Sequence, residues 1–309
     1  MRLTPTSSLY PGFSLHQRKA AGVPARILDG RAVAAELGAV LRPRIVALRE
    51  RGIHPKLAIL FVGDDAASLS YVRTLERAGE RVGIATEVER LPVSAREDDV
   101  RARLSRYRDD CSVHGVMLQQ PLPEHLDIRA IADAMPQYKD VDGCHPANEG
   151  SLAFGKSTLF VPATPAAVML LLERSPHWPL HGRNAAMIGR SAVVGAPVAL
   201  LMLAEDASVT VLHKASRSLQ PYVRMADVVV TATGVPGLLR GEDFAPGATV
   251  IDVGTTLVDN KLVGDVDFES AANVAGALTP VPGGVGPVTS VALLRNVVIA
   301  AERFSGAST

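Results

Sequence analysis

A glycine-bearing turn between an apolar run and an apolar helical stretch has the spacing of an anion-binding site. Residues 185–188 are long enough for one buried strand, and Gly195 and Pro197 open a stretch typical of a helix. Such a turn places backbone amides and the positive end of a helix dipole above the carboxyl end of the strand, where they can bind a phosphate. The spacing G-R-S-x-x-V-G-x-P departs from G-x-G-x-x-G, so a turn that binds nothing is the alternative.

The segment after the next strand indicates which dinucleotide would bind. Dinucleotide folds usually place an acidic residue there for NAD and a basic residue for NADP. Residues 213–217 read His-Lys-Ala-Ser-Arg, so Lys214 and Arg217, with Arg190, could meet a 2′-phosphate, and NADP is favoured over a merely solvated basic loop. The predicted cofactor-binding residues are Gly189, Arg190, Ser191, Val194, Gly195, Pro197, His213, Lys214, Ser216, Thr233 and Gly254.

Three polar residues occupy positions that face the cleft in parallel α/β folds. Tyr71 falls in the first turn of a predicted helix, Gln119 ends a predicted strand, and Asp142 lies in a loop before the domain join. Each has an ordinary alternative: a tyrosine packed on the core, an exposed strand-end glutamine and an aspartate in a turn. Together with the anion-binding turn, they favour a functional cleft.

Alternating strands and helices are expected to position these residues, which predicts an α/β fold with a largely parallel sheet. The predicted strands are 57–62, 85–91, 115–119, 185–188, 208–212, 227–231 and 250–253. The predicted helices are 27–51 with Asp29 as N-cap, 68–82, 98–107, one from Thr164, one from Gly195, one ending near Ala226, and 289–303. A loop-rich join ends near Gly155, and a Gly/Pro-rich linker covers 281–287. The last helix is expected to return to the first domain, so that a cleft separates two α/β layers, the second Rossmann-like.

Composition narrows the class of protein. The length of 309 residues favours two domains, and 32 basic residues balance 32 acidic ones, which argues against a nucleic-acid or membrane surface. Cys111 and Cys144 have no metal-ligand spacing and are expected to be reduced thiols in a cytoplasmic protein that needs no metal. No apolar run is expected to reach the length of a membrane span, and residues 1–25 are expected to form a flexible tail rather than a secretory signal.

Seven segments in unbroken order over about residues 26–303 resemble the bifunctional methylenetetrahydrofolate dehydrogenase/cyclohydrolase family, FolD. They are VGDDAASLSYV, GVMLQQPLP, KDVDGCHPANEGSL, IGRSAVVGAP, TVIDVG, VGDVDF and TPVPGGVGPVT. The resemblance implies a homodimer that binds tetrahydrofolate derivatives in the cleft. It also implies a catalytic domain at 26–148 plus 284–305 and an NADP-binding domain at 149–283.

The resemblance assigns roles to single residues. The family's tyrosine, at Tyr71, stacks near the pterin, and its aspartate, at Asp142, holds the pterin's amino edge. The family's glutamine, at Gln119, helps to position a lysine in a Y-V-x-x-K pattern that is central to the cyclohydrolase step. That lysine position holds Leu75 here. The implied substrate-binding residues are Ser68, Tyr71, Gln119, Pro121, Asp142, Pro282, Gly283 and Gly284.

The two family reactions make different demands on the protein. Hydride transfer mainly requires two rings to be oriented, whereas hydrolysis of the methenyl cation requires general acid–base chemistry, which leucine cannot supply. We therefore expect an NADP-dependent dehydrogenase with lost or weak cyclohydrolase activity, in a pocket reshaped at Gln120 and Cys144. The alternatives are a fully bifunctional enzyme, in which Gln119, Gln120 and water replace the lysine, and a non-catalytic folate- or nucleotide-binding paralogue.

Overall fold

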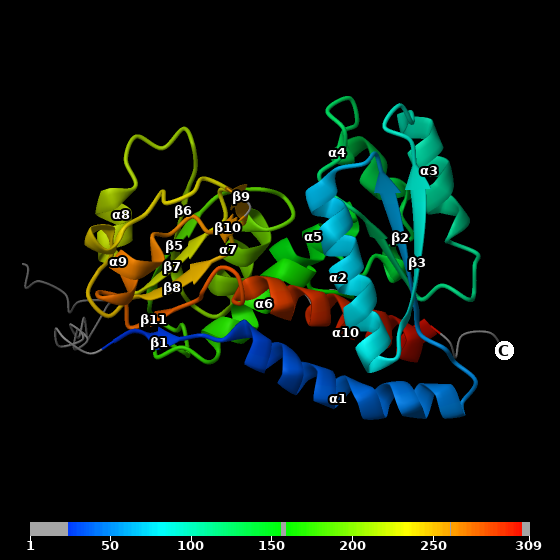
Figure 1. Ribbon diagram of the computed structural model, residues 1–309, viewed down its shortest axis with the longest axis horizontal. Helices are drawn as coiled ribbons and strands as arrows, with labels where there is room; N and C mark the ends of the chain where they lie inside the picture. Colours follow the sequence, from blue (N-terminus) through cyan, green and yellow to red (C-terminus); the bar gives the residue numbers. More distant parts are fainter. Residues whose placement is uncertain (1–23, 156–158, 260, 305–309) are drawn as a thin grey trace, which may run out of the picture.

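Two α/β lobes lie side by side over a pair of long helices (Figure 1). The computed structural model describes residues 24–155, 159–259 and 261–304. Most of the predicted tail therefore lies outside the described residues. Its last residue, Ala25, is buried, and its N–H donates to the carbonyl of Ala272 at 3.2 Å, so the chain is already attached to the second lobe at this point.

The first lobe contains a three-stranded parallel sheet in the order β3-β2-β4. Its strands are β2 (Lys56–Val62), β3 (Ala85–Leu91) and β4 (Gly115–Leu118). The central strand β2 is apolar almost throughout because a parallel strand covered on both faces must bury every side chain. The helices of this lobe are α2 (Ala66–Val82), α3 (Glu97–Arg106) and α4 (Ile128–Ile131). Helix α5 (Pro146–Ala153) leads from this lobe to the second and packs on α7 (Gly195–Ala204) there.

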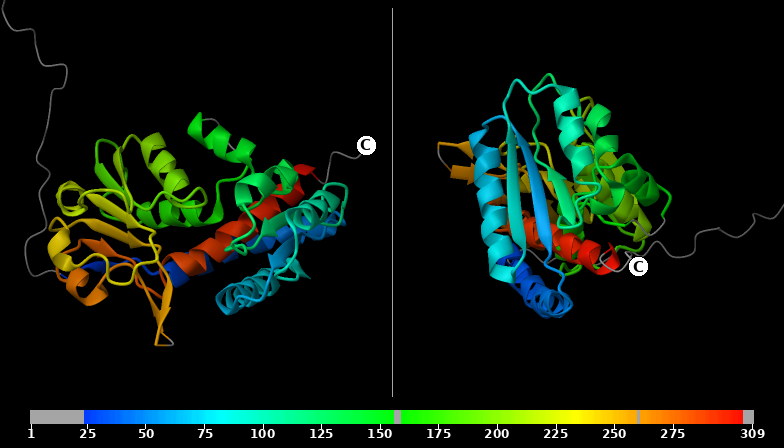
Figure 2. Two further views of the ribbon diagram at one scale, coloured as in Figure 1. Left: turned by 90° about the horizontal axis from the view of Figure 1, so that it is seen from above. Right: turned by 90° about the vertical axis from the view of Figure 1, so that its right-hand side faces the viewer.

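The second lobe contains a six-stranded parallel sheet in the order β1-β11-β8-β7-β5-β6. Its strands are β1 (Arg26–Ile27), β5 (Asn184–Ile188), β6 (Ser208–Leu212), β7 (Val228–Thr231), β8 (Thr249–Asp252) and β11 (Ala277–Leu278). Its helices are α6 (Ala163–Leu172), α7 (Gly195–Ala204), α8 (Gln220–Met225) and α9 (Phe268–Ala272). An antiparallel hairpin of β9 (Thr256–Val258) and β10 (Lys261–Val263) projects from this lobe (Figure 2).

The long helices α1 (Gly30–Glu50) and α10 (Val285–Phe304) run beneath both lobes (Figure 1). Each contributes side chains to the hydrophobic core of both: Val33 and Val285 to the second lobe, Leu41 and Val297 to the first. The predicted N-cap of α1 is confirmed, since Asp29 Oδ1 accepts the N–H of Arg31 at 2.8 Å. Two continuous helices thus connect the lobes.

Four expectations from the sequence are wrong in detail. The last helix begins at Val285 rather than at 289, because a proline such as Pro287 is tolerated in a first helical turn. The predicted loop-rich join contains α5. Tyr71 lies in the second turn of α2, since that helix already begins at Ala66. The residues 285–303 are also long and apolar enough to span a membrane, with a mean hydropathy of 1.3; 72% of that window is buried, as in a core helix that packs on two lobes.

Candidate active site

Ser68 and Tyr71 come from the start of α2, beyond the carboxyl end of β2. Asp65 caps this helix, and its Oδ2 accepts the N–H of Ser68 at 2.7 Å. Ser68 is buried, and its hydroxyl lies 3.5 Å from the carbonyl oxygen of Gln120. The α2 N-terminus is thereby held against the segment that follows β4.

Tyr71 and Asp142 interact, although 71 residues of sequence separate them. Burial first, and the charge of Asp142 second, raise the pKa of the Tyr71 hydroxyl, and the Ser290 side chain on α10 partly offsets this rise. Tyr71 is therefore a neutral hydroxyl at physiological pH, beside a carboxylate. The structure brings these two predicted site residues together and adds Ser290, which the sequence analysis did not identify.

Asp142 is a carboxyl group that titrates near neutrality. Burial first, and the charge of Asp140 second, raise its pKa to about 7. The backbone N–H of Ala163, the first residue of α6, and the Cys144 thiol both favour the charged carboxylate and oppose this rise. The Sγ to Oδ2 distance is 3.9 Å. A partly desolvated carboxylate of this kind forms strong, charge-assisted hydrogen bonds with a ligand that presents two adjacent N–H groups.

Gln119 carries an unused acceptor at the end of β4. Only 5% of the residue is exposed, and its Nε2 donates to the carbonyl of Gln120. Its Oε1 is buried and has no hydrogen-bond partner among the residues that the structure describes. A buried acceptor without a donor costs free energy, so this oxygen suits a donor that arrives with a ligand or with water.

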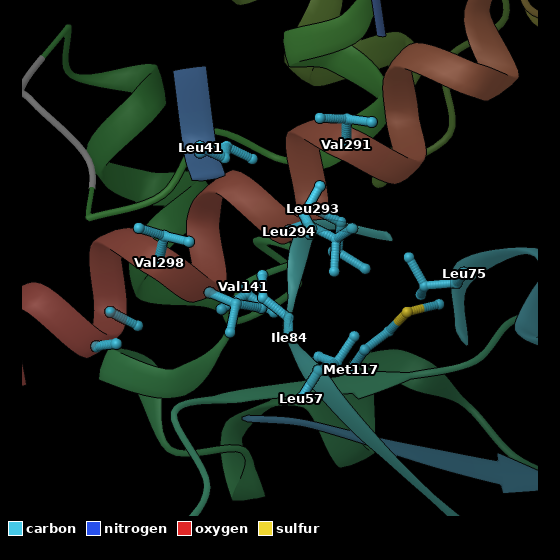
Figure 3. Packing of buried hydrophobic residues seen from close by; sticks show 14 of the residues in the cluster. Leu41, Leu57, Leu75, Ile84, Met117, Val141, Val291, Leu293, Leu294 and Val298 are labelled. Carbon is cyan, nitrogen blue, oxygen red and sulfur yellow. The ribbon is translucent and has the colours of Figure 1, made fainter. Parts of the chain in front are cut away.

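Leu75, at the lysine position of the resemblance, belongs to the hydrophobic core. It lies one turn beyond Tyr71 on α2 and is completely buried, in one cluster with Met117 and Leu294 (Figure 3). Arg73 and Arg77 are exposed on α2. The expectation that Tyr71 and Leu75 share a helix face is confirmed, since Tyr71 packs against the same cluster. Leu75 offers no group that could exchange a proton.

Gln120 and Cys144 add polar atoms near Asp142. Gln120 Nε2 lies 3.8 Å from Cys144 Sγ, which in turn faces Asp142. Burial raises the pKa of the Cys144 thiol, so it is a neutral SH group. Within the described part of the chain, no group of three His, Cys, Asp or Glu side chains could hold a metal ion.

The predicted anion-binding turn lies between β5 and α7. Gly189 has a φ of 114°, and a Cβ there would lie 2.4 Å from the carbonyl oxygen of Ala232. A Cβ at Gly195 would lie 2.3 Å from the carbonyl oxygen of Gly189. Only glycine therefore fits either position, and the turn folds back on itself as a close phosphate cradle requires. Ser191 closes the turn, because its carbonyl accepts the N–H of Ala196 at 3.0 Å.

The basic residues expected to select the cofactor lie beyond β6, next to β5 in the sheet. The N–H of His213 donates to Ser216 Oγ at 3.0 Å, and the Ser216 N–H donates back to the His213 carbonyl at 2.7 Å. Lys214 and Arg217 are exposed on this tight turn. Neither is in an ion pair with any described residue, so both charges are available to an anionic ligand.

Two buried aspartates, which the sequence analysis missed, shape the ends of β7 and β8. Asp265 Oδ2 accepts hydrogen bonds from Thr231 Oγ1 at 2.8 Å and from the N–H of Thr233 at 2.6 Å. Asp252 Oδ1 accepts the N–H of Gly254 at 2.9 Å, and burial raises the pKa of Asp252 to about 7. The sequence signal was available, since each aspartate lies within one or two residues of a glycine in TVIDVG and VGDVDF.

Residues 282–284 form a turn that leads directly into α10 and abuts the start of α1. The N–H of Gly30 donates to the Gly283 carbonyl at 2.9 Å, and a Cβ at Gly30 would lie 1.7 Å from the Gly284 carbonyl oxygen. Gly283 itself has a φ of 111°. The glycines of this turn therefore permit a backbone contact between the beginnings of the two connecting helices.

Two family models cover most of the chain. The catalytic domain of tetrahydrofolate dehydrogenase/cyclohydrolase matches residues 28–142, and the NAD(P)-binding domain of the same enzymes matches residues 162–305. The chain belongs to the tetrahydrofolate dehydrogenase/cyclohydrolase family. The predicted resemblance and the predicted two-lobed α/β class are thereby confirmed.

Members of the tetrahydrofolate dehydrogenase/cyclohydrolase family from distant organisms match over almost their whole length. The bifunctional protein FolD of Moorella thermoacetica is 46% identical over 282 residues, which are 91% of this chain and 100% of that protein. The FolD structure from Campylobacter jejuni superimposes with a TM-score of 0.87 at 39% identity, over 90% of this chain and 99% of that one. The Trypanosoma brucei FolD structure, complexed with NADP cofactor and inhibitor, gives a TM-score of 0.89 at 36% identity, over 93% and 100%.

Proposed function

We propose that this protein oxidises 5,10-methylenetetrahydrofolate to 5,10-methenyltetrahydrofolate with NADP⁺ and hydrolyses the product only slowly. Two observations together carry the proposal: the charge of Asp142 acts on the buried hydroxyl of Tyr71 on α2, and the lysine position on the same helix holds a leucine sealed in the core. The dinucleotide turn is fully formed in the second lobe, which a non-catalytic folate-binding paralogue would not need.

Residues of the first lobe hold and orient the folate. The Asp142 carboxylate accepts N–H groups of the pterin's amino edge, and Tyr71 packs on the pterin ring, with Ser68, Gln119 and Pro121 around it. NADP⁺ supplies the hydride acceptor, and orientation of the two rings accounts for most of the catalysis, because the substrate's own nitrogens stabilise the cation that forms.

Residues of the second lobe hold the dinucleotide. The amides of the turn around Gly189 and Gly195 would bind the pyrophosphate at the N-terminus of α7, and Lys214 and Arg217 would bind the 2′-phosphate. Thr233 and Gly254 lie on the loops that the buried aspartates hold at the carboxyl ends of β7 and β8. Residues 149–283 thus form the proposed NADP-binding domain, and residues 26–148 with 284–305 the proposed folate-binding domain.

Cofactor choice is expected to depend on Lys214. The unmodified protein should use NADP⁺ with a higher kcat/KM than NAD⁺. Lys214→Asp should reverse or abolish this preference, because it replaces a phosphate-binding cation by a ribose-binding carboxylate; one charge-assisted hydrogen bond is worth about 1.5–3 kcal/mol, or roughly 10- to 100-fold. The measurement is kcat/KM for both cofactors at constant folate concentration.

Arg42→Asp is the matched control for Lys214→Asp, since Arg42 is exposed on α1 and the exchange alters the net charge equally. It should leave the NADP⁺ to NAD⁺ ratio unchanged. Equal use of the two cofactors by the unmodified protein would refute the assignment.

Folate affinity should depend on pH through Asp142. Its pKa of about 7 means that the carboxyl is protonated below neutrality and binds the pterin edge as an anion above it. The dissociation constant of a folate should therefore fall as the pH rises from 6 to 8 and level off above that range. Titration calorimetry with 5-formyltetrahydrofolate across this range measures the affinity, and a flat profile would exclude Asp142 as the ligand.

The Asp142 carboxyl group binds its proton more tightly in the folded than in the unfolded protein, so its contribution to the free energy of unfolding is fully present below pH 4 and is lost as the pH rises through 7.

The projecting hairpin β9–β10 is proposed as the contact between two copies of the chain. Leu257 is 62% and Leu262 47% exposed, and a two-stranded ribbon leaves two strand edges unpaired (Figure 2). We expect a dimer by light scattering and a monomer for Leu257→Asp combined with Leu262→Asp. A monomeric unmodified protein would contradict the proposal. Both cysteines are free thiols, in keeping with the proposed cytoplasmic location.

A further inference from the structure

A buried asparagine on α10 joins two backbone segments that lie on either side of α5 in the sequence. Only 1% of Asn296 is exposed. Its Nδ2 donates to the carbonyl of Val141 at 2.8 Å and to the carbonyl of Val161 at 2.9 Å. Both N–H groups of one amide are thus used, each on a different stretch of backbone.

Both of these backbone stretches lead to residues that surround the Asp142 carboxylate. Val141 immediately precedes it, and Val161 leads through Pro162 to Ala163, whose N–H at the N-terminus of α6 favours the charged form of Asp142. One side chain therefore links the loop that carries Asp142 to the start of α6, the helix end that stabilises its charge. A Cβ at Gly143 would lie 2.7 Å from the Pro162 side chain, which shows how closely the two segments pack.

Asp140 fixes the same loop from its other side. Its carboxylate is completely buried and accepts the N–H groups of Cys144 at 3.0 Å and His145 at 2.7 Å, together with Asn148 Nδ2 at 2.8 Å. All three donors follow Asp142 within residues 144–148. Asp140 therefore orders the loop internally, whereas Asn296 attaches it to α10 and to the start of α6.

We propose that Asn296 is a positioning residue of the folate site, which fixes the position of the Asp142 carboxylate relative to the N-terminus of α6. The inference rests on the proposed role of Asp142 as a folate ligand. Asn296 acts through Asp142 and need not touch the substrate. Its loss should weaken folate binding and leave NADP⁺ binding unchanged, because its two hydrogen bonds reach the carboxylate loop and not the dinucleotide turn.

The test uses Asn296→Leu, which keeps the size of the side chain and removes both donors. The dissociation constant of 5-formyltetrahydrofolate should rise about tenfold or more, because a displaced carboxylate weakens charge-assisted hydrogen bonds worth about 1.5–3 kcal/mol each, while that of NADP⁺ stays within about twofold. Asn296→Ser keeps one donor on a shorter side chain and should give a smaller loss of folate affinity. If the leucine variant does not fold, the folate constant of the serine variant tests the proposal instead. Val298→Ala is the matched control, since Val298 is buried on the same helix and is a member of the first-lobe core. It should lower the melting temperature without changing the folate constant.

A double variant separates positioning from general destabilisation. If Asn296 acts only through Asp142, then Asn296→Leu with Asp142→Ala should bind 5-formyltetrahydrofolate no more weakly than Asp142→Ala alone. Additive losses, or equal losses for folate and NADP⁺, would overturn the inference. Tight folate binding by both the unmodified protein and Asn296→Leu would overturn it while leaving the proposed function intact. Failure of the unmodified protein to bind folate would overturn the proposed function itself.

Discussion

Leu75→Lys is expected to accelerate hydrolysis of 5,10-methenyltetrahydrofolate by about 10²-fold over the unmodified protein. General acid–base assistance is worth about 10²–10⁴-fold, and the lower end applies because the surrounding pocket also differs at Gln120 and Cys144. The buried Oε1 of Gln119, which has no donor among the described residues, is available to orient the new amine. Burial should also lower the pKa of that amine towards neutrality, where proton exchange is most effective. The measurement is the decay of methenyl absorbance without cofactor.

The same exchange should destabilise the fold, because position 75 is sealed among Met117 and Leu294. Leu75→Met is the matched control: it keeps an apolar side chain of similar size and should leave both hydrolysis and the melting temperature nearly unchanged. If Leu75→Lys folds and hydrolyses the methenyl substrate no faster than Leu75→Met, the missing amine does not explain slow hydrolysis.

Asp142→Ala should weaken folate binding by at least about 10- to 100-fold. The carboxylate is expected to accept charge-assisted hydrogen bonds from the pterin's amino edge, each worth about 1.5–3 kcal/mol. The NADP⁺ constant should stay within about twofold, since the dinucleotide turn lies on the other lobe. Titration calorimetry with each ligand measures both constants. Asp109→Ala, at an exposed acidic position of the first lobe, is the control and should change neither. An unaltered folate dissociation constant for Asp142→Ala would show that Asp142 only shapes its turn and does not bind folate.

The elements that the sequence predicted well are those with a strong local signal. The strands β2 and β5 and the N-cap at Asp29 could be predicted from the residues next to them in the sequence, which are apolar runs in the first case and a helix start in the second. The two-residue strands β1 and β11 exist only because each pairs with a distant part of the chain, so no local pattern announces them. The start of α10 was placed late because glycine and proline suggest a linker, whereas here they form a first helical turn.

The same distinction applies to the site. The dinucleotide turn could be predicted because a strand, a glycine-bearing turn and a helix start follow one another directly in the sequence. The structure adds the reason for the glycines, since a Cβ at Gly189 or Gly195 would collide with a backbone carbonyl. The sequence also placed Tyr71 and Leu75 on one face of α2 from helical spacing alone. It could not show that Asp142 meets Ala163, or that Asn296 holds both segments, because those contacts join residues up to 155 positions apart.

The most direct test of the account follows methenyl absorbance with the unmodified protein in two stages. With 5,10-methylenetetrahydrofolate and NADP⁺, the absorbance should rise as the methenyl product forms. After NADP⁺ is exhausted, the absorbance should decay hardly faster than in buffer, because no residue at position 75 exchanges protons with water. A rise followed by rapid decay would show that another group supplies the proton chemistry and that the enzyme is fully bifunctional. No rise at all, in a protein that binds both ligands, would contradict the proposed dehydrogenase.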